Sequence, residues 1–127
     1  MKWHCSWIWF VFAGCPGFGG QSASNGLLSE VPDSPNYDEH VSLIMDAYCV
    51  SCHGDEPTAG APGTFRLDIY TSEDKPGVFD VADRVLIRSE NTALPMPPSP
   101  PFLDSIELET LSVWLDHGAP ENGDVAP

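Results

Sequence analysis

Apolar residues follow a helical period in three stretches of the chain. In residues 37–49, one face carries apolar side chains at the spacing i, i+3, i+4, i+7, namely Val41, Ile44, Met45 and Tyr48. Residues 80–88 repeat the pattern over a shorter length, with Ala82, Val85 and Leu86 inward. The third stretch, 105–117, places four apolar residues on one face, Leu108, Leu111, Trp114 and Leu115. Residues 65–70 alternate and predict a short extended segment or a turn of helix. The pattern predicts helices over the first three of these stretches.

Helix-capping signals bracket the first and last of these stretches. Ser34-Pro35 and Asn36 are alternative starts for the first helix, and Glu39 stands in capping-box register with Asn36. Asp104 and Glu107 form the same pair ahead of the last helix. Glycines at 54 and 118 favour termination.

The segments outside these helices divide the chain. Residues 16–36 are rich in Gly, Ser, Pro and Asn, and the C-terminal end is similar. We therefore expect a flexible tether at 15–36, one domain at 37–120 and a disordered tail at 121–127. A domain of about 80 residues has a thin core, and such domains commonly need a covalent or metal staple.

The pentapeptide Cys49-Val50-Ser51-Cys52-His53 has the Cys-x-x-Cys-His spacing by which a haem is attached to a polypeptide. Two thiols separated by two residues can reach the two vinyl groups on one porphyrin edge. The imidazole of His53 can then bind the iron from the proximal side. The motif predicts one covalent haem c, with Cys49 and Cys52 as its attachment points.

Two other sites could use the same residues. A structural zinc site needs four ligands, but the remaining cysteines, Cys5 and Cys15, lie near the start and form no second knuckle. A redox-active dithiol would open a helix, where the helix dipole lowers the thiol pKa, whereas this pair closes a helical pattern. Both alternatives are disfavoured.

Met96 is the candidate for the second axial ligand. A thioether suits haem iron, and the prolines on both sides hold the backbone extended, so the side chain can be presented at low entropic cost. Met45 and His40 lie on the proximal helix and reach the opposite face poorly. His117 is the more serious rival, although a His at a helix end commonly interacts with the last carbonyls.

These motifs together resemble the small bacterial class I cytochrome c domain over residues 37–120. The matching order is Cys-x-x-Cys-His-Gly at 49–54, Arg-Leu-Asp at 66–68, Met-Pro-Pro at 96–98 and Trp-Leu-Asp-His-Gly-Ala at 114–119. The resemblance implies an all-α fold of three to four helices wrapped around one covalently bound haem c, with His53 and Met96 as axial ligands. It also implies that a proline carbonyl orients the His53 ring, from Pro57 or Pro62. One of the three arginines, Arg66, Arg84 or Arg88, could pair with a haem propionate or with a carboxylate.

The N-terminus predicts export. Lys2 precedes an apolar run too short to span a bilayer, and Phe12-Ala13-Gly14-Cys15 resembles a bacterial lipobox. We expect residues 1–14 to be a signal peptide and Cys15 to carry a lipid. The protein would then be a periplasm-facing lipoprotein of the cell envelope, in the inner or outer membrane. An ordinary signal peptide that leaves a soluble periplasmic protein is the alternative.

The net charge of −14 disfavours nucleic acid and anionic membrane surfaces as direct partners. A redox partner with a basic docking face is expected instead. With two axial ligands on the iron, the predicted function is electron transfer without catalysis. A haem peroxidase or ligand sensor with a displaceable Met96, or an accessory haem subunit of a larger redox complex, is the alternative.

Overall fold

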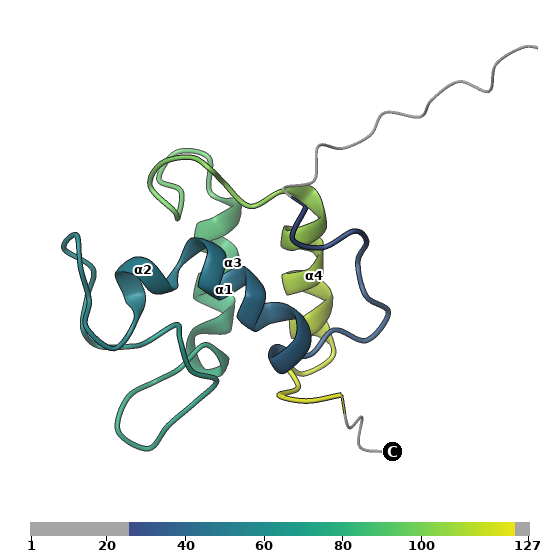
Figure 1. Ribbon diagram of the computed structural model, residues 1–127, viewed down its shortest axis with the longest axis horizontal. Coiled ribbons are helices and arrows are strands. Elements are labelled where there is room, and N and C mark those ends of the chain that lie inside the picture. The colour runs from purple at the N-terminus through teal and green to yellow at the C-terminus, as the bar shows by residue number, and fades with distance from the viewer. Residues whose placement is uncertain (1–25, 124–127) are drawn as a thin grey trace, which may run out of the picture.

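The computed structural model describes residues 26–123 and has four α-helices and no strand within that range. Figure 1 shows the helices packed around one another, with α2 at one side and α4 at the other. The all-α expectation is confirmed for this part of the chain. In chain order the elements are the π-helical turn η1 Tyr37–Val41, α1 Ser42–Tyr48, α2 Val50–His53, the 3-10 turn η2 Phe79–Val81, α3 Ala82–Glu90 and α4 Ser105–Asp116.

The first predicted helix is observed as two pieces, η1 and α1, and α2 follows them as a separate short helix. Its start is Asn36, whose Oδ1 accepts a hydrogen bond from the Glu39 backbone N–H at 2.8 Å. The Asn36 side-chain amide donates to the Glu39 carboxylate, and the Asn36 backbone N–H donates to His40 Nδ1 at 3.2 Å. The prediction that Asn36 and Glu39 form the capping pair is therefore confirmed. The backbone N–H of Asn36, however, bonds to His40 and not to the Glu39 side chain.

The chain bends at Cys49, the last residue of the helix predicted over 37–49. Cys49 has φ −121° and ψ −43°, so the chain turns there and α2 begins as a separate helix. The Cys49 N–H still bonds to Met45 O at 2.8 Å, and His53 N–H bonds to Cys49 O at 2.9 Å. Backbone hydrogen bonding therefore continues through the bend. The spacing of apolar residues along the sequence stays helical there, so it does not reveal the bend.

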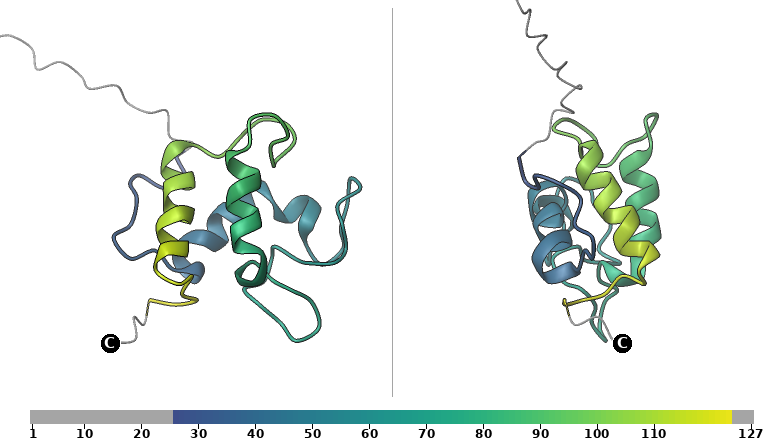
Figure 2. Two further views of the ribbon diagram at one scale, coloured as in Figure 1. Left: turned by 180° about the vertical axis from the view of Figure 1, so that it is seen from behind. Right: turned by 90° about the vertical axis from the view of Figure 1, so that its right-hand side faces the viewer.

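The core lies between α1, α3 and α4. Figure 2 shows α3 and α4 side by side, with α1 crossing behind them. Trp114 is 1% exposed, and its ring N–H donates to Pro120 O at 2.9 Å. The other side chains with almost no exposed surface include Val41, Ile44, Met45, Val78 and Leu111. The apolar faces predicted for the first and last helices are the faces that form this core.

Helix α4 begins with the predicted capping box and adds a buried carboxylate. Asp104 accepts from the Glu107 N–H at 2.9 Å, and Glu107 Oε2 accepts from the Asp104 N–H at 2.8 Å. Glu107 is fully buried, and its other oxygen accepts from the Tyr48 hydroxyl at 3.0 Å. One side chain thus caps α4 and joins it to the end of α1.

A clasp after α4, residues 119–121, closes the domain. Tyr37 N–H donates to Pro120 O and Asp38 N–H donates to Glu121 O, both at 2.9 Å, while the Tyr70 hydroxyl donates to Ala119 O at 2.7 Å. Gly118 reaches the clasp through a left-handed turn with φ +84°, which glycine adopts without strain. The first residue of the expected tail is therefore bound to the domain.

The start of the domain also differs from the expected boundary. Leu27 and Leu28 pack against the core, and Pro35 and Asn36 are buried, so the end of the segment assigned to the tether lies on the domain. The predicted signal peptide at 1–14 and Cys15 fall outside the described residues. Within residues 26–123, no helix has both the length and the apolar character needed to cross a membrane.

A long loop connects α2 to η2 and folds back on itself. Leu67 N–H donates to His53 O at 2.7 Å, and Val78 and Phe79 donate to Ile69 O and Tyr70 O at 3.0 and 2.9 Å. A Cβ at Gly77 would collide with the Tyr70 carbonyl, so this close approach requires glycine. Residues 65–70 form neither strand nor helix.

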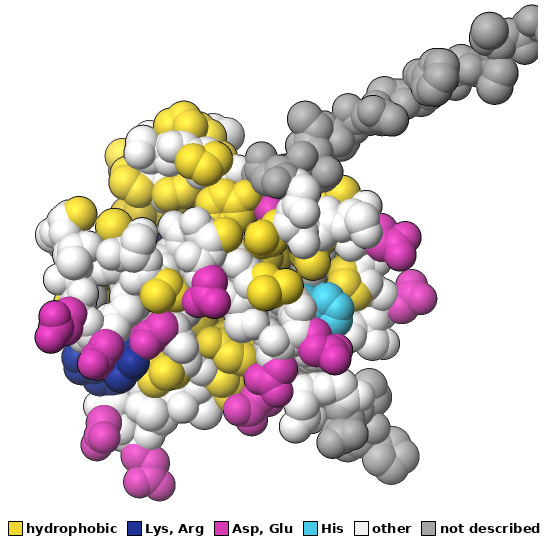
Figure 3. All heavy atoms as spheres, in the orientation of Figure 1, with side chains coloured by type: hydrophobic (Ala, Val, Ile, Leu, Met, Phe, Trp, Pro, Cys, Tyr) yellow, Lys and Arg dark blue, Asp and Glu magenta, His cyan; other side chains and the backbone are white. Residues whose placement is uncertain are grey.

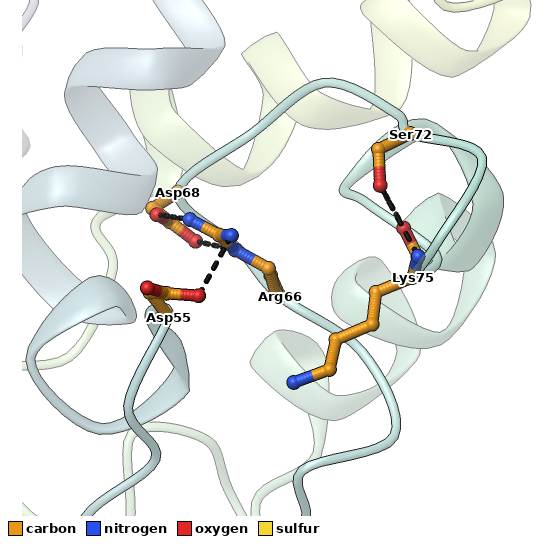
Figure 4. A network of polar contacts seen from close by, with 5 residues as sticks. All are labelled: Asp55, Arg66, Asp68, Ser72 and Lys75. Atoms are coloured by element: carbon orange, nitrogen blue, oxygen red, sulfur yellow. Dashed lines mark hydrogen bonds and ion pairs between the residues drawn. The ribbon is translucent and has the colours of Figure 1, made fainter.

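Arg66 ties this loop to the end of α2. Its guanidinium lies between two carboxylates, with a 2.8 Å contact to Asp55 and a two-point contact to Asp68 (Figure 4). The hydrogen bond from Arg66 is the main reason why the pKa of Asp68 is lowered. Arg66 therefore has the carboxylate-paired role that was one of its two expected roles.

Candidate functional site

A cavity of about 610 Å³ opens between α2, the inner face of α3 and the loop that joins α3 to α4. Its volume lies within the range of about 300 to 1,000 Å³ that is typical of small-molecule sites. Cys49, Cys52, His53 and Met96 all contribute to its wall. The structure thus brings the four haem-related residues singled out from the sequence to one cavity.

The two cysteines reach the cavity as free thiols. Both are half-buried, and Cys49 and Cys52 form no disulfide. Burial, with the neighbouring Cys52, raises the pKa of the Cys49 thiol to about 12. This raised pKa disfavours the thiolate form of Cys49, which both zinc binding and disulfide exchange use.

Both the ring and the backbone of His53 are held by contacts with the loop that follows α2. The ring stacks on Phe65, with 5.2 Å between centroids and 17° between planes, and the backbone carbonyl accepts from Leu67. Burial lowers the pKa of His53, which favours the neutral imidazole that binds a metal.

The Nδ1 atom of His53 is buried and has no hydrogen-bond partner within the described chain. The carbonyl of Pro57 or Pro62 expected from the family resemblance therefore does not hold this ring here, although Pro62 lines the cavity. Buried polar atoms in proteins are nearly always satisfied. This nitrogen is covered by protein atoms, so its lack of a partner is an exception to that rule and not a sign of a bound group.

Met96 reaches the cavity from the loop after α3. Its backbone N–H donates to Arg88 O at 3.0 Å, which attaches this part of the loop to the end of the helix. Asn91 Oδ1 accepts from the Ala93 and Leu94 N–H groups at 2.9 and 2.8 Å and so shapes the start of the loop. The Met96 side chain is 37% exposed. Its thioether can therefore face the cavity without disturbing the core.

The rival ligands considered from the sequence lie elsewhere. Met45 is fully buried in the core, and His40 accepts a backbone hydrogen bond at the start of η1. His117 is exposed at the end of α4, where its N–H donates to Val113 O at 3.0 Å. None of the three lines the cavity.

The charge of the cavity wall contrasts with that of the protein. No Asp or Glu of the described chain lines the cavity, whereas Arg84 and Arg88 of α3 both do. The Arg84 guanidinium lies 5.7 Å from the centroid of the Phe65 ring. Sequence reasoning named these arginines only among three; their i, i+4 spacing on the helix was the available signal that they share a face.

The mouth of the cavity lies beside an uncharged surface. Residues 91–103 contain no charged side chain, and Leu94, Met96 and Phe102 are exposed among them. Figure 3 shows apolar side chains gathered over this loop, while acidic side chains are spread over the rest of that face. The loop therefore offers an apolar rim in a strongly acidic protein.

The wall of the cavity combines sulfur and nitrogen donors with a largely apolar surface. Two thiols, an imidazole and a thioether line it together with two arginines. Within residues 26–123, no three His, Cys, Asp or Glu side chains gather as ligands for a metal ion. Comparisons with protein-family models, curated proteins and solved structures find no match to this chain.

Proposed function

We propose that this protein is an electron carrier with one covalently attached haem c in the cavity described above. Cys49 and Cys52 would form thioethers with the vinyl groups, and His53 and Met96 would be the axial ligands. Each thioether forms when a Cys S–H adds across a vinyl C=C bond, so neither an oxidant nor a leaving group is needed. Bound there, the haem supplies one-electron exchange between ferric and ferrous iron.

The observation that carries this proposal is the meeting of segments 49–53 and 96 at one cavity. The two segments are far apart in the chain. A chance Cys-x-x-Cys-His sequence would not need a cavity beside it, nor a thioether on the wall of that cavity. The absence of carboxylates from the described wall adds support.

The composition of the Met96 wall favours electron transfer over peroxidase chemistry. On this side the cavity is lined by Pro97, Pro98, Pro101 and Ser99. A peroxidase uses a distal acid–base residue near the reacting oxygen. Prolines supply no such group, and they hold Met96 in a restricted backbone. The residues of this wall thus position one ligand and limit the access of water.

The location proposed for this carrier is the periplasmic side of the bacterial cell envelope, through a lipid on Cys15. Support comes from the lipobox-like sequence alone, because residues 1–25 are outside the described range. Covalent haem attachment is an extracytoplasmic process in bacteria, so the proposed export and the proposed cofactor are consistent with each other.

The decisive experiment is haem extraction from the full chain, made in a host that attaches haem c. The wild-type protein should keep its haem through acid-acetone extraction and give the alkaline pyridine spectrum of two thioethers. The double variant Cys49→Ala with Cys52→Ala should lose it. Ser51→Ala is the matched control, because it changes the same turn and leaves both thiols and His53 in place.

Two outcomes would contradict the proposal. Haem that stays with the doubly substituted protein through extraction would rule out thioether attachment. Rapid binding of carbon monoxide by the reduced wild type, with an unchanged spectrum after Met96→Ala, would show an open sixth position and exclude the carrier with two axial ligands.

A further inference from the structure

Glu107 of α4 is a charged side chain in the interior of the protein. Among the residues that the structure describes, it is the only Asp, Glu, Lys or Arg that is fully buried. Its place in the capping box does not explain this burial, because Glu39 contacts its own capping partner, Asn36, while exposed to solvent. Burying a charge is costly unless other groups replace the lost water. The interior position of Glu107 therefore points to a role besides capping.

The surroundings of Glu107 stabilise a negative charge. One carboxylate oxygen accepts from the Asp104 backbone N–H at 2.8 Å, and the other accepts from the Tyr48 hydroxyl at 3.0 Å. Glu107 also lies in the first turn of α4, at the end of the helix where the macrodipole is positive. Hydrogen bonds to an ionised acceptor are stronger than neutral ones. The protein thus holds a carboxylate in its interior with two donors and a helix end.

Tyr48 joins this carboxylate to the cavity. Tyr48 is the last residue of α1, directly precedes Cys49 and lines the cavity wall. Glu107 does not line the cavity, so its carboxylate lies behind the wall and is linked to it by one hydrogen-bonded side chain. Water and salt screen a buried charge less than a surface charge. Glu107 can therefore act on the contents of the cavity more strongly than an exposed carboxylate of the same helix.

We infer that Glu107, held behind Tyr48, sets the reduction potential of the group in the cavity through its negative charge. This inference rests on the proposed function and names a residue that regulates it. The carboxylate acts at a distance and takes no part in attaching or ligating the haem. The Tyr48 hydrogen bond fixes where the charge lies relative to the cavity wall, so Tyr48 is the positioning residue of the pair.

The effect on reduction has a definite sign. Ferric haem carries one more positive charge than ferrous haem, so a nearby carboxylate stabilises the oxidised state and lowers the potential. Glu107→Gln keeps the size of the side chain and removes its charge. This change should favour the reduced protein by about tenfold in the equilibrium constant, which is 59 mV for one electron.

The test compares Glu107→Gln with two other variants in the full haem-loaded chain. Glu109→Gln is the matched control, because it removes the same charge from an exposed position on the same helix. Glu107→Asp keeps the charge but shortens the side chain, so it disturbs the contacts to Tyr48 and Asp104. The pyridine spectrum is measured first and establishes that covalent haem is present. The reduction potential of each protein is then measured at pH 8.

We expect Glu107→Gln to keep covalent haem and to have a higher potential than the wild type. Glu109→Gln should shift the potential much less, and Glu107→Asp should stay closer to the wild type than Glu107→Gln does. A Glu107→Gln potential equal to that of Glu109→Gln would overturn the inference. Equal shifts in Glu107→Asp and Glu107→Gln would also overturn it, since they would show a structural effect and not one of charge. Absence of covalent haem from the wild type would instead refute the proposed function.

A second measurement depends on no change at Glu107. Infrared difference spectra between the reduced and oxidised wild type report on side chains that respond to the charge of the iron. The C–O band of Tyr48 is identified by its loss in Tyr48→Phe. It should shift on reduction, because the field of the iron alters the hydrogen bond between Tyr48 and Glu107. A Tyr48 band that stays fixed would overturn the inference even if Glu107→Gln gave no folded protein.

Discussion

Removing the hydroxyl of Tyr48 should destabilise the protein more than removing that of Tyr70. The Tyr48 hydroxyl donates to Glu107, a fully buried carboxylate, at 3.0 Å. The Tyr70 hydroxyl donates to a neutral acceptor, the Ala119 carbonyl, at 2.7 Å. Hydrogen bonds to charged groups contribute about 1.5 to 3 kcal/mol, and neutral ones about 0.5 to 1.5 kcal/mol. We expect Tyr48→Phe to cost about 2 kcal/mol and Tyr70→Phe about 1 kcal/mol.

The free energy of unfolding is obtained from denaturant titration of the full chain, followed by far-ultraviolet circular dichroism. For a domain of this size, 1 kcal/mol corresponds to about 4 to 8 °C in Tm, so the two variants should separate clearly in a thermal scan as well. Glu107→Gln supplies the matched partner for a double-mutant cycle with Tyr48→Phe. The two changes should be coupled, because they remove parts of one interaction. Equal losses for the two tyrosines, or additive effects in the cycle, would refute this reasoning.

Four further predictions concern the site and the surface. Met96→His should lower the reduction potential and remove the weak far-red band of the oxidised protein, as seen by potentiometry and optical spectra; an unchanged potential would mean that Met96 is not the ligand. Cys15→Ser should move the protein from the membrane fraction to the soluble periplasm with its haem spectrum intact, and a fully soluble wild type would exclude the lipid anchor. Electron transfer to basic acceptors should slow as salt rises, since the Debye length falls from about 30 Å at 0.01 M to about 10 Å at 0.1 M; a rate independent of salt in stopped flow would exclude steering. Arg66 lowers the pKa of Asp68, so its stabilisation is present above the unfolded pKa of about 4 and is lost as the pH falls. The loss of stability caused by Arg66→Met in urea titrations should therefore shrink from pH 6 to pH 3, and an equal loss at both pH values would contradict it.

Local signals in the sequence predicted those elements whose causes are local. The Asp104–Glu107 capping pair and the apolar face around Trp114 give α4 nearly as observed, because both depend on residues within one or two turns. The bend at Cys49 depends on the dihedral angles of one residue, and helical spacing is unchanged across it. The course of residues 54–79 depends on bonds between distant positions, such as Leu67 to His53, which spacing does not encode.

The same distinction applies to the site. Cys49, Cys52 and His53 are close together in the chain, so their joint role could be predicted from the motif alone. Met96 was named from the chemistry of a thioether between prolines, and it lines the same cavity. The arginines of α3 could be assigned only once the rotation of that helix about its axis was known, since the sequence places them on one face without saying what the face meets. The burial of Glu107 was missed for the same reason.

The clasp formed by residues 119–121 means that the start of the domain is fixed by a segment that is synthesised late. It supplies the carbonyls that bind Tyr37, Asp38 and the ring of Trp114, so the start of the domain is not fixed until the segment after the last helix has been made. Synthesis proceeds from the N-terminus, and the Cys-x-x-Cys-His segment precedes the clasp by more than half of the described chain. During that interval the segment is accessible on an open polypeptide. A haem attached then would already be in place when the clasp forms.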